Sequence, residues 1–274
     1  MNTKLAFGVL CLLIANGPAQ SEVLKVGGTG AALGLLQKLS GAFSDVHPGD
    51  KVHVVDGLGS SGAILATADG ALQFAISGRP LKPEEKAKGL EGAAFIETPF
   101  LFVSSHPKRQ KLTKVDVLGI YDGTLAKWPD GLPIKPVLRP KSDAATAFLV
   151  SSFEGMEPAM DKLRARPEVP VAATDQDNTA TAEKIANSFT GITLLQLLTE
   201  KPRLQAVMLD GVNPSVETMA NGSYPLKMTM YAVTTSRPSP IAQRFAQFLR
   251  SAEVEKIVRD NGGVVVPPAA TSSQ

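Results

Sequence analysis

Cysteine and histidine are scarce in this chain of 274 residues, which has one of the former and three of the latter. Cys11 lies in an N-terminal segment that we expect to be removed, so the mature chain would hold neither a thiol nor a disulfide. That excludes thiol catalysis and cysteine-ligated metal sites. His47, His53 and His106 lack the spacing of metal ligands. We therefore expect no cofactor and no bound metal.

An excess of charge of one sign is also missing, because the formal net charge is only +2. Nucleic-acid backbones select strongly basic surfaces, so we expect no nucleic-acid partner. After the first segment, no apolar run is long enough to span a membrane. The hydrophobic fraction of 43% is ordinary for a globular protein that is stabilised by its core alone.

The first 21 residues have the three parts of a secretory signal peptide. Lys4 supplies the positive start, and the apolar run "LAFGVLCLLIA" is too short to cross a bilayer as a helix. Small residues for cleavage follow near Ala19 and Ser21. Leu10 before Cys11 does not fit a lipoprotein signal. The pattern predicts a signal peptide over residues 1–21 and a periplasmic location.

Strand and helix signals alternate through the first part of the remaining chain. The apolar runs "VLKVGG", "DKVHVVDG" and "LQFAIS" are separated by "AALGLLQKLSGAF" and "GAILATADGA", which have helical spacing. This order predicts an α/β fold with a largely parallel sheet. The segment "AAFIETPFLFVSSHP" predicts either a strand pair or one long strand interrupted at Pro99. No linker divides the chain, which favours two interleaved lobes over tandem domains.

Four polar loops follow predicted strands and enter predicted helices. In open α/β sheets, ligands bind at the carboxyl ends of strands, and helix N-termini attract anions. Each loop alone is also typical of an ordinary helix cap or a solvated surface. The glycines match neither a dinucleotide fingerprint nor a Walker loop. The loops are "GGTGA" with Thr29, "GLGSSGA" with Ser60 and Ser61 at a helix N-cap, "SGRP" with Ser77 and Arg79, and "LRPKSDAAT" with Arg139, Ser142, Asp143 and Thr146.

Catalytic arrangements are absent from the sequence. There is no Gly-x-Ser-x-Gly elbow and no persuasive set of serine, histidine and aspartate. A hydrolase that uses Asp143 or Ser60 is a weaker hypothesis, because neither residue has a credible base beside it. We expect a binding protein with no catalytic residues.

The motifs, taken in order, cover almost all of the mature chain. "DGLGSSGA" precedes "QFAISGRPL", then come "LTKVDVLGIYDGTLAKWPDGLPIKPVLRP" with Trp128, "LDGVNPSVETMANGSYPLKMTMYAVTT" and the closing helices in "FAQFLRSAEVEKIVRDNGGVVVP". This series resembles the periplasmic phosphate-binding proteins of ABC importers. The resemblance implies a type II periplasmic-binding-protein fold, with two lobes of mixed sheet flanked by helices and a ligand cleft between them.

The resemblance also implies boundaries and a function. Lobe one would comprise residues 22–98 and 228–274, and lobe two residues 99–227. The protein would be a monomeric, exported solute-binding protein that captures a small ligand, phosphate or another oxyanion, for an ABC importer.

The family's ligand residues transfer unevenly to this chain. Its serine falls on Ser60 and its threonine loop on "GGTGA", whereas its proton-accepting aspartate falls on Gly78. In the "RPKSDAAT" loop the family's Ser-Gly pair becomes Ala144-Ala145. The ligand set implied in this way is Thr29, Gly30, Ala31, Ser60, Ser61, Ser77, Gly78, Arg79, Arg139, Ser142, Asp143 and Thr146.

The departures leave two hypotheses for the ligand. Without a carboxylate at position 78, we expect a roomier cleft that no longer selects protonated oxyanions. Arg79 and Arg139 would still hold an anion if they face the cleft. If instead they pair with Asp143 or Glu97, the cleft would suit an uncharged or partly apolar ligand. The protein would then be a periplasmic accessory, a lipid or small-molecule carrier, or a sensor.

Overall fold

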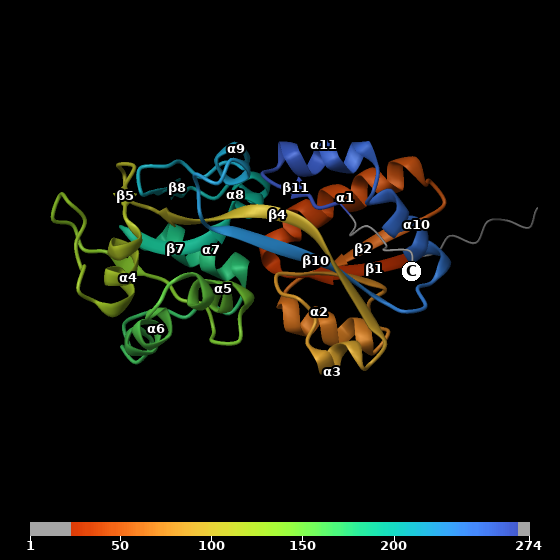
Figure 1. The fold of residues 1–274 in the computed structure, drawn as a ribbon, viewed down its shortest axis with the longest axis horizontal. Helices are drawn as coiled ribbons and strands as arrows, with labels where there is room; N and C mark the ends of the chain where they lie inside the picture. The colour runs from red at the N-terminus through yellow and green to blue at the C-terminus, as the bar shows by residue number, and fades with distance from the viewer. Residues whose placement is uncertain (1–22, 268–274) are drawn as a thin grey trace, which may run out of the picture.

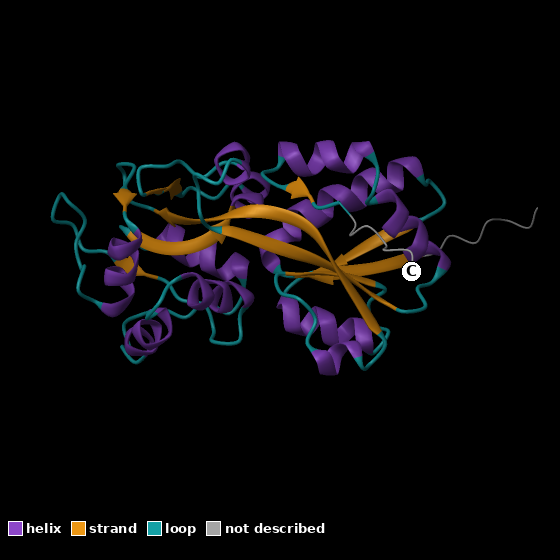
Figure 2. Ribbon diagram, viewed as in Figure 1, coloured by secondary structure: helices purple, strands orange, loops and turns teal. Residues whose placement is uncertain are grey.

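A computed structural model describes residues 23–267, so the predicted signal peptide lies outside the described residues. The elements gather in two halves, and the long strands β4 (Leu90–Ser104) and β10 (Lys227–Thr235) run through both (Figure 1). Helices flank the strands in each half (Figure 2). The two-lobed α/β fold predicted from the sequence is confirmed.

One half is built from the start of the chain, in the strand–helix order that the sequence predicts. Parallel strands lie in the order β2-β1-β3, and β10 joins them antiparallel to β3. The elements are β1 (Val23–Gly28), the 3-10 turn η1 (Gly30–Ala32), α1 (Leu33–Val46), β2 (Lys51–Val55), α2 (Gly59–Ala68), β3 (Phe74–Ser77) and α3 (Pro83–Lys86). The end of the chain adds α10 (Pro240–Phe248), α11 (Ala252–Asp260) and β11 (Val264–Val265) to this half (Figure 1).

The other half holds the middle of the chain. Its strands continue the same sheet, because β4 pairs antiparallel with β7 and β7 pairs in parallel with β6. The elements are β5 (Lys111–Leu112), α4 (Lys114–Asp122), β6 (Lys135–Pro136), α5 (Ala144–Ser152), α6 (Met156–Arg164), α7 (Asp175–Lys184), β7 (Ser188–Thr193), α8 (Leu194–Glu200), β8 (Gln205–Ala206), β9 (Met208–Leu209) and α9 (Val216–Ala220).

Strand β4 is continuous through Pro99, where the sequence suggested an interruption. Pro99 lies opposite Lys227 at the end of the β10 ladder, and pairing with β7 begins at the next residue, Phe100. Proline has no N–H to donate, so it is tolerated where one ladder gives way to another. The strand therefore passes from one half to the other without a break.

Each half has its own aromatic cluster within one continuous core. In the first half, Phe43 and Phe245 pack edge to face with ring centroids 5.2 Å apart. In the second half, Phe102 stacks on Phe189 at 5.1 Å, beside the buried Trp128.

Within residues 23–267, no helix combines the length and apolar character needed to cross a membrane.

Candidate functional site

A cavity of about 140 Å³ lies where loops from the two halves meet. Helices α2, α5 and α7 each direct their first turn at it. The first N–H groups of a helix have no partner within the helix, and its dipole is positive at this end. Three such ends around one cavity favour a negatively charged ligand. The lining residues are Gly30, Gly57, Leu58, Gly59, Ser60, Ser61, Arg139, Pro140, Ser142, Asp143, Ala144, Ala173, Thr174, Asp175 and Gln176.

The α2 loop differs from the prediction at its cap. The helix begins at Gly59 after Leu58, so Ser60 and Ser61 lie in the first turn and do not cap it. Gly57 and Gly59 have φ angles of 71° and 62°, a left-handed conformation in which glycine is favoured, and they start the helix before the serines. Ser60 Oγ instead accepts a hydrogen bond from the backbone N–H of Gly78 at 2.9 Å. This bond ties the loop to the end of β3.

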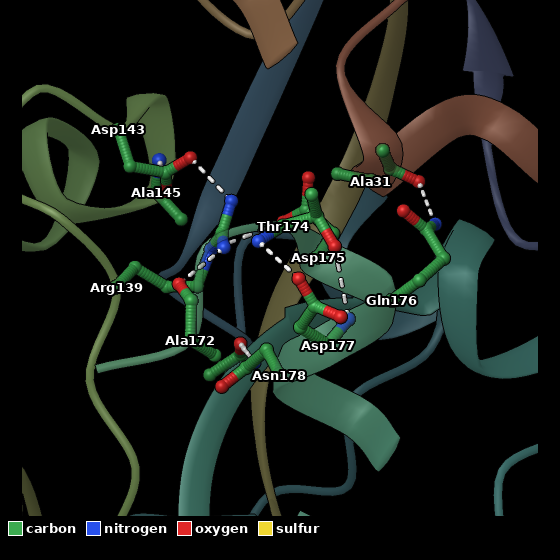
Figure 3. Close-up of polar contacts among 12 residues, drawn as sticks. Ala31, Arg139, Asp143, Ala145, Ala172, Thr174, Asp175, Gln176, Asp177 and Asn178 are labelled. Carbon is green, nitrogen blue, oxygen red and sulfur yellow. Dashed lines mark hydrogen bonds and ion pairs between the residues drawn. The ribbon is translucent and has the colours of Figure 1, made fainter. Parts of the chain in front are cut away.

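Arg139 is the positive group of the cavity. Its side chain is 8% exposed. It donates from Nη1 to the carbonyl of Ala172 and from Nη2 to Asp143, each at 2.7 Å. Nε is buried and has no hydrogen-bond partner. Figure 3 shows the guanidinium between Asp143 on one side and the start of α7 on the other. The arginine is therefore clamped in place with donor capacity left for a ligand.

Neighbouring groups hold the Arg139 segment in position. Asp143 caps α5 by accepting from the Ala145 N–H at 3.0 Å, so one carboxylate orients both the helix and the guanidinium. Arg164 donates to the Arg139 carbonyl at 3.0 Å, and Thr146 Oγ1 donates to the same carbonyl at 3.5 Å. Thr146 thus supports Arg139 from behind without lining the cavity, whereas Ser142 lines it directly.

Asp175 is a second carboxylate of the cavity, and the sequence did not point to it. It is the first residue of α7 and is only 7% exposed, with Oδ1 at 3.7 Å from Arg139 Nε. Thr174 and Asp177 form a capping box that starts the helix. The Thr-x-x-Asp pattern in "TDQD" is a helix-start signal, and with it Asp175 could have been placed at a helix N-terminus beside the predicted loops.

The environment of Asp175 opposes its ionisation. Burial raises the pKa of its carboxyl to about 6, and the negative charge of Asp143 acts in the same direction. The Arg139 charge and a hydrogen bond from the Ala31 N–H act in the opposite direction but do not overcome burial. Asp143 is thus hydrogen-bonded to Arg139, whereas Asp175 makes only a longer ion pair with it and has a raised pKa.

Asp175 should make the ligand-free protein less stable as the pH rises. Its folded pKa lies above the ordinary value of about 3.9, so the folded state binds the proton more tightly. The stability that the folded protein gains from protonated Asp175 is complete below about pH 4 and is lost as the pH rises through about 6. We expect Asp175→Asn to raise the free energy of unfolding by about 2 kcal/mol at neutral pH and by much less at about pH 4. Urea unfolding at the two pH values measures this, and an equal effect at both would contradict it.

Side chains of the second half donate hydrogen bonds to the backbone of the first half beside the cavity. Gln176 donates from Nε2 to the Gly30 carbonyl at 3.0 Å and to Glu200 at 2.7 Å. Thr193 donates to the Ala31 carbonyl at 2.8 Å. Gly30 packs so closely on α7 that a Cβ there would lie 2.8 Å from the Cβ of Asp175. The two halves are therefore in direct contact beside the cavity.

The remaining predicted residues lie near the cavity without lining it. Thr29 is buried before η1, and Ser77 Oγ donates to the Arg79 carbonyl at 2.7 Å. Arg79 pairs with Glu85 at 2.7 Å and also donates to Ser61, so its charge is already matched. The sequence offered Asp143 or Glu97 as partners for the two arginines. Asp143 does pair with Arg139, whereas Glu97 pairs with Lys227.

The extra room expected beside Gly78 is filled. A Cβ on Gly78 would lie 2.9 Å from Met228 Cε and 3.1 Å from the Cβ of Ala144. The glycine and the alanine thus pack against each other across the two halves.

Among residues 23–267 there is no group of three or more histidine, cysteine, aspartate or glutamate side chains placed to hold a metal ion.

Two α/β halves joined by crossing strands, with a small polar cavity between their facing loops, define a solute-binding protein. The chain belongs to the PBP superfamily, whose domain model matches residues 15–253. This membership confirms the predicted family and makes the protein a binding protein, not an enzyme.

Phosphate-binding proteins are among the proteins that resemble this chain. The chain is 24% identical over 261 residues to the phosphate-binding protein PstS of Bacillus subtilis (strain 168), covering 90% of this chain and 81% of the relative. A Clostridium perfringens phosphate ABC transporter substrate-binding protein, solved with bound phosphate, has a similar fold, with a TM-score of 0.77 at 20% identity, over 89% of this chain and 100% of that one. An ABC-type phosphate transport receptor from Vibrio cholerae superposes with a TM-score of 0.61 at 17% identity, over 89% and 100% of the two chains.

Proposed function

We propose that this protein is an exported solute-binding protein that captures phosphate, or a closely related small oxyanion, for delivery to an ABC importer. The observation that carries the proposal is Arg139, whose buried guanidinium lies among three helix N-termini and has an Nε without a hydrogen-bond partner. A charged donor together with backbone N–H groups binds oxyanions strongly, because charge-assisted hydrogen bonds are the stronger ones.

The size of the cavity supports a small ion over a larger organic ligand. A volume of about 140 Å³ equals the share of roughly four or five waters in the liquid. Pockets for drug-sized ligands have volumes of roughly 300–1,000 Å³. The alternative of a partly apolar ligand would need more room and more apolar wall than the side chains around Arg139 provide.

The relatives supply the rest of the proposal. Three proteins whose names describe phosphate binding or phosphate transport resemble this chain in fold or sequence over most of its length. The structure of one of them was solved with bound phosphate. We infer a periplasmic location, a signal peptide over residues 1–21 and a monomeric state. We also infer one lobe from residues 22–98 and 228–274 and a second from residues 99–227.

Titration of inorganic phosphate into the mature, phosphate-stripped protein tests the proposal. We expect one-to-one binding and a thermal stabilisation that grows with ligand, by about 2.7 kcal/mol at 100 times Kd. Glycerol at the same concentration is the neutral control and should give neither. Absence of heat and of stabilisation with phosphate would contradict the proposal, and the ligand would then be sought by mass spectrometry of what copurifies.

A further inference from the structure

We propose that Asp175 is the specificity-determining residue of the cavity: it accepts a hydrogen bond from the acidic proton of a protonated oxyanion and rejects oxyanions that carry none. This inference deepens the proposed function and rests on it. It assigns the discrimination to the start of α7, on the opposite side of the cavity from Gly78.

The carboxylate is placed to meet a ligand and is not fully occupied. It lines the cavity while remaining 7% exposed, so a ligand there is in contact with it and bulk water is largely excluded. The Ala31 N–H donates to it, and Arg139 Nε lies 3.7 Å from Oδ1, beyond hydrogen-bond distance. An ionised carboxylate has about four acceptor positions, so several remain for a donor from the ligand.

The charges of the cavity make this acceptor selective. The cavity has one cation and two carboxylates, because Arg139 lies 2.7 Å from Asp143 and 3.7 Å from Asp175, so ionisation of Asp175 gives the three groups a net negative charge. A fully ionised oxyanion brings no hydrogen and places a like charge beside the carboxylate. A protonated oxyanion brings the hydrogen that the carboxylate needs. Rejection by an unpaired like charge is a strong source of specificity, since the wrong ligand gains nothing that offsets it.

The same geometry makes the selection dependent on pH. The charged groups around Asp175 are Arg139, Asp143 at the start of α5, and Glu200 on α8, and of these only Arg139 favours its ionised form. When Asp175 takes up a proton, it becomes a donor and can bind an unprotonated oxyanion. The raised pKa of about 6 places this change in a range that is easy to measure. Sulfate should therefore be excluded at high pH and admitted at low pH.

The experiment compares phosphate and sulfate by calorimetry at about pH 5 and about pH 8. For the unaltered protein we expect phosphate to bind at both values, and sulfate to bind at least about tenfold more tightly at the lower pH. For Asp175→Asn, whose amide can donate at any pH, we expect sulfate at about pH 8 to bind at least about tenfold more tightly than to the unaltered protein. The dependence of sulfate affinity on pH should also disappear. Asp69→Asn removes a carboxylate at the exposed far end of α2 and should leave both affinities unchanged.

The outcomes separate this inference from the proposed function. If the unaltered protein binds neither anion at either pH, the proposed function fails and the selection fails with it. If phosphate binds but Asp175→Asn retains the full preference for phosphate over sulfate, the role of Asp175 is overturned while the function stands. The pH series on the unaltered protein is independent of whether the variant folds. A sulfate affinity that does not rise at low pH would also overturn the role of Asp175.

Discussion

Replacing Arg139 by alanine is expected to weaken phosphate binding by about 100-fold or more. The guanidinium is the only cationic group that lines the cavity among the described residues, and its geometry is set by Ala172 and Asp143. Removing one partner of a buried charged hydrogen bond costs roughly 2–5 kcal/mol, and each 1.4 kcal/mol is a factor of about ten in Kd. Calorimetric titration of both proteins measures the change.

The variant also leaves Asp143 and Asp175 as buried carboxylates without their cation. We expect a loss of roughly 3–5 kcal/mol in the free energy of unfolding, so folding should be checked by circular dichroism before titration. Arg79→Ala is the informative comparison. It removes a positive charge from a neighbouring loop, but one that is committed to Glu85. We expect it to change affinity by less than about threefold. Equal losses in the two variants would mean that general positive charge, not the Arg139 geometry, holds the anion.

Gly30→Ala is expected to weaken binding by about tenfold or more while leaving each half folded. A Cβ at this position would lie 2.5 Å from Gln176 Oε1, 2.7 Å from Asp175 Oδ2 and 2.8 Å from Asp175 Cβ. Gln176 can rotate away, but the Asp175 Cβ is fixed to α7, so the two halves must separate slightly. Overpacking of this kind typically costs 1–3 kcal/mol. The cost falls on the contact between the two halves beside the cavity.

Two measurements define the Gly30 effect. Titration gives the loss of affinity, and small-angle scattering with saturating phosphate should show a larger radius of gyration than for the unaltered protein. Gly41→Ala is the matched control, because Gly41 is exposed in α1 and a Cβ there meets nothing within 4 Å. It should be neutral or slightly stabilising. If Gly30→Ala binds phosphate as the unaltered protein does, the contact between η1 and α7 is not required for capture.

The fold was largely predictable because its signals are local. Strands β1, β2 and β3 are short apolar runs, and α1 and α2 lie between them, so period and turn residues suffice to place them. Prediction was weakest where a neighbour decides the outcome. Pro99 was expected to break its strand, and only the change of partner from β10 to β7 shows why it does not.

The site was predictable in part, for the same reason. Arg139, Asp143, Ser142 and Ser60 stand in loops whose composition marks helix starts, and the structure brings all four to one cavity. Asp175 is different, because its burial and its distance from Arg139 arise only when α7 packs against η1 from the other half. No local pattern encodes a contact of this kind. The exchange at Gly78 was likewise expected to enlarge the cleft, since the packing of this glycine against Ala144 and Met228 is a tertiary property that no local pattern shows.

The two crossing strands limit how the protein can move. Strands β4 and β10 remain hydrogen-bonded from Leu90 opposite Thr235 to Pro99 opposite Lys227, with one register shift between Met230 and Tyr231. Sliding one half past the other would break that ladder, whereas bending and twisting at the bulge would not. The ladder thus favours a hinge over sliding as the relative movement of the halves, and a hinge keeps the donors on the two walls facing each other. The geometry of recognition would therefore depend on the intact β4–β10 ladder as well as on the residues that line the cavity.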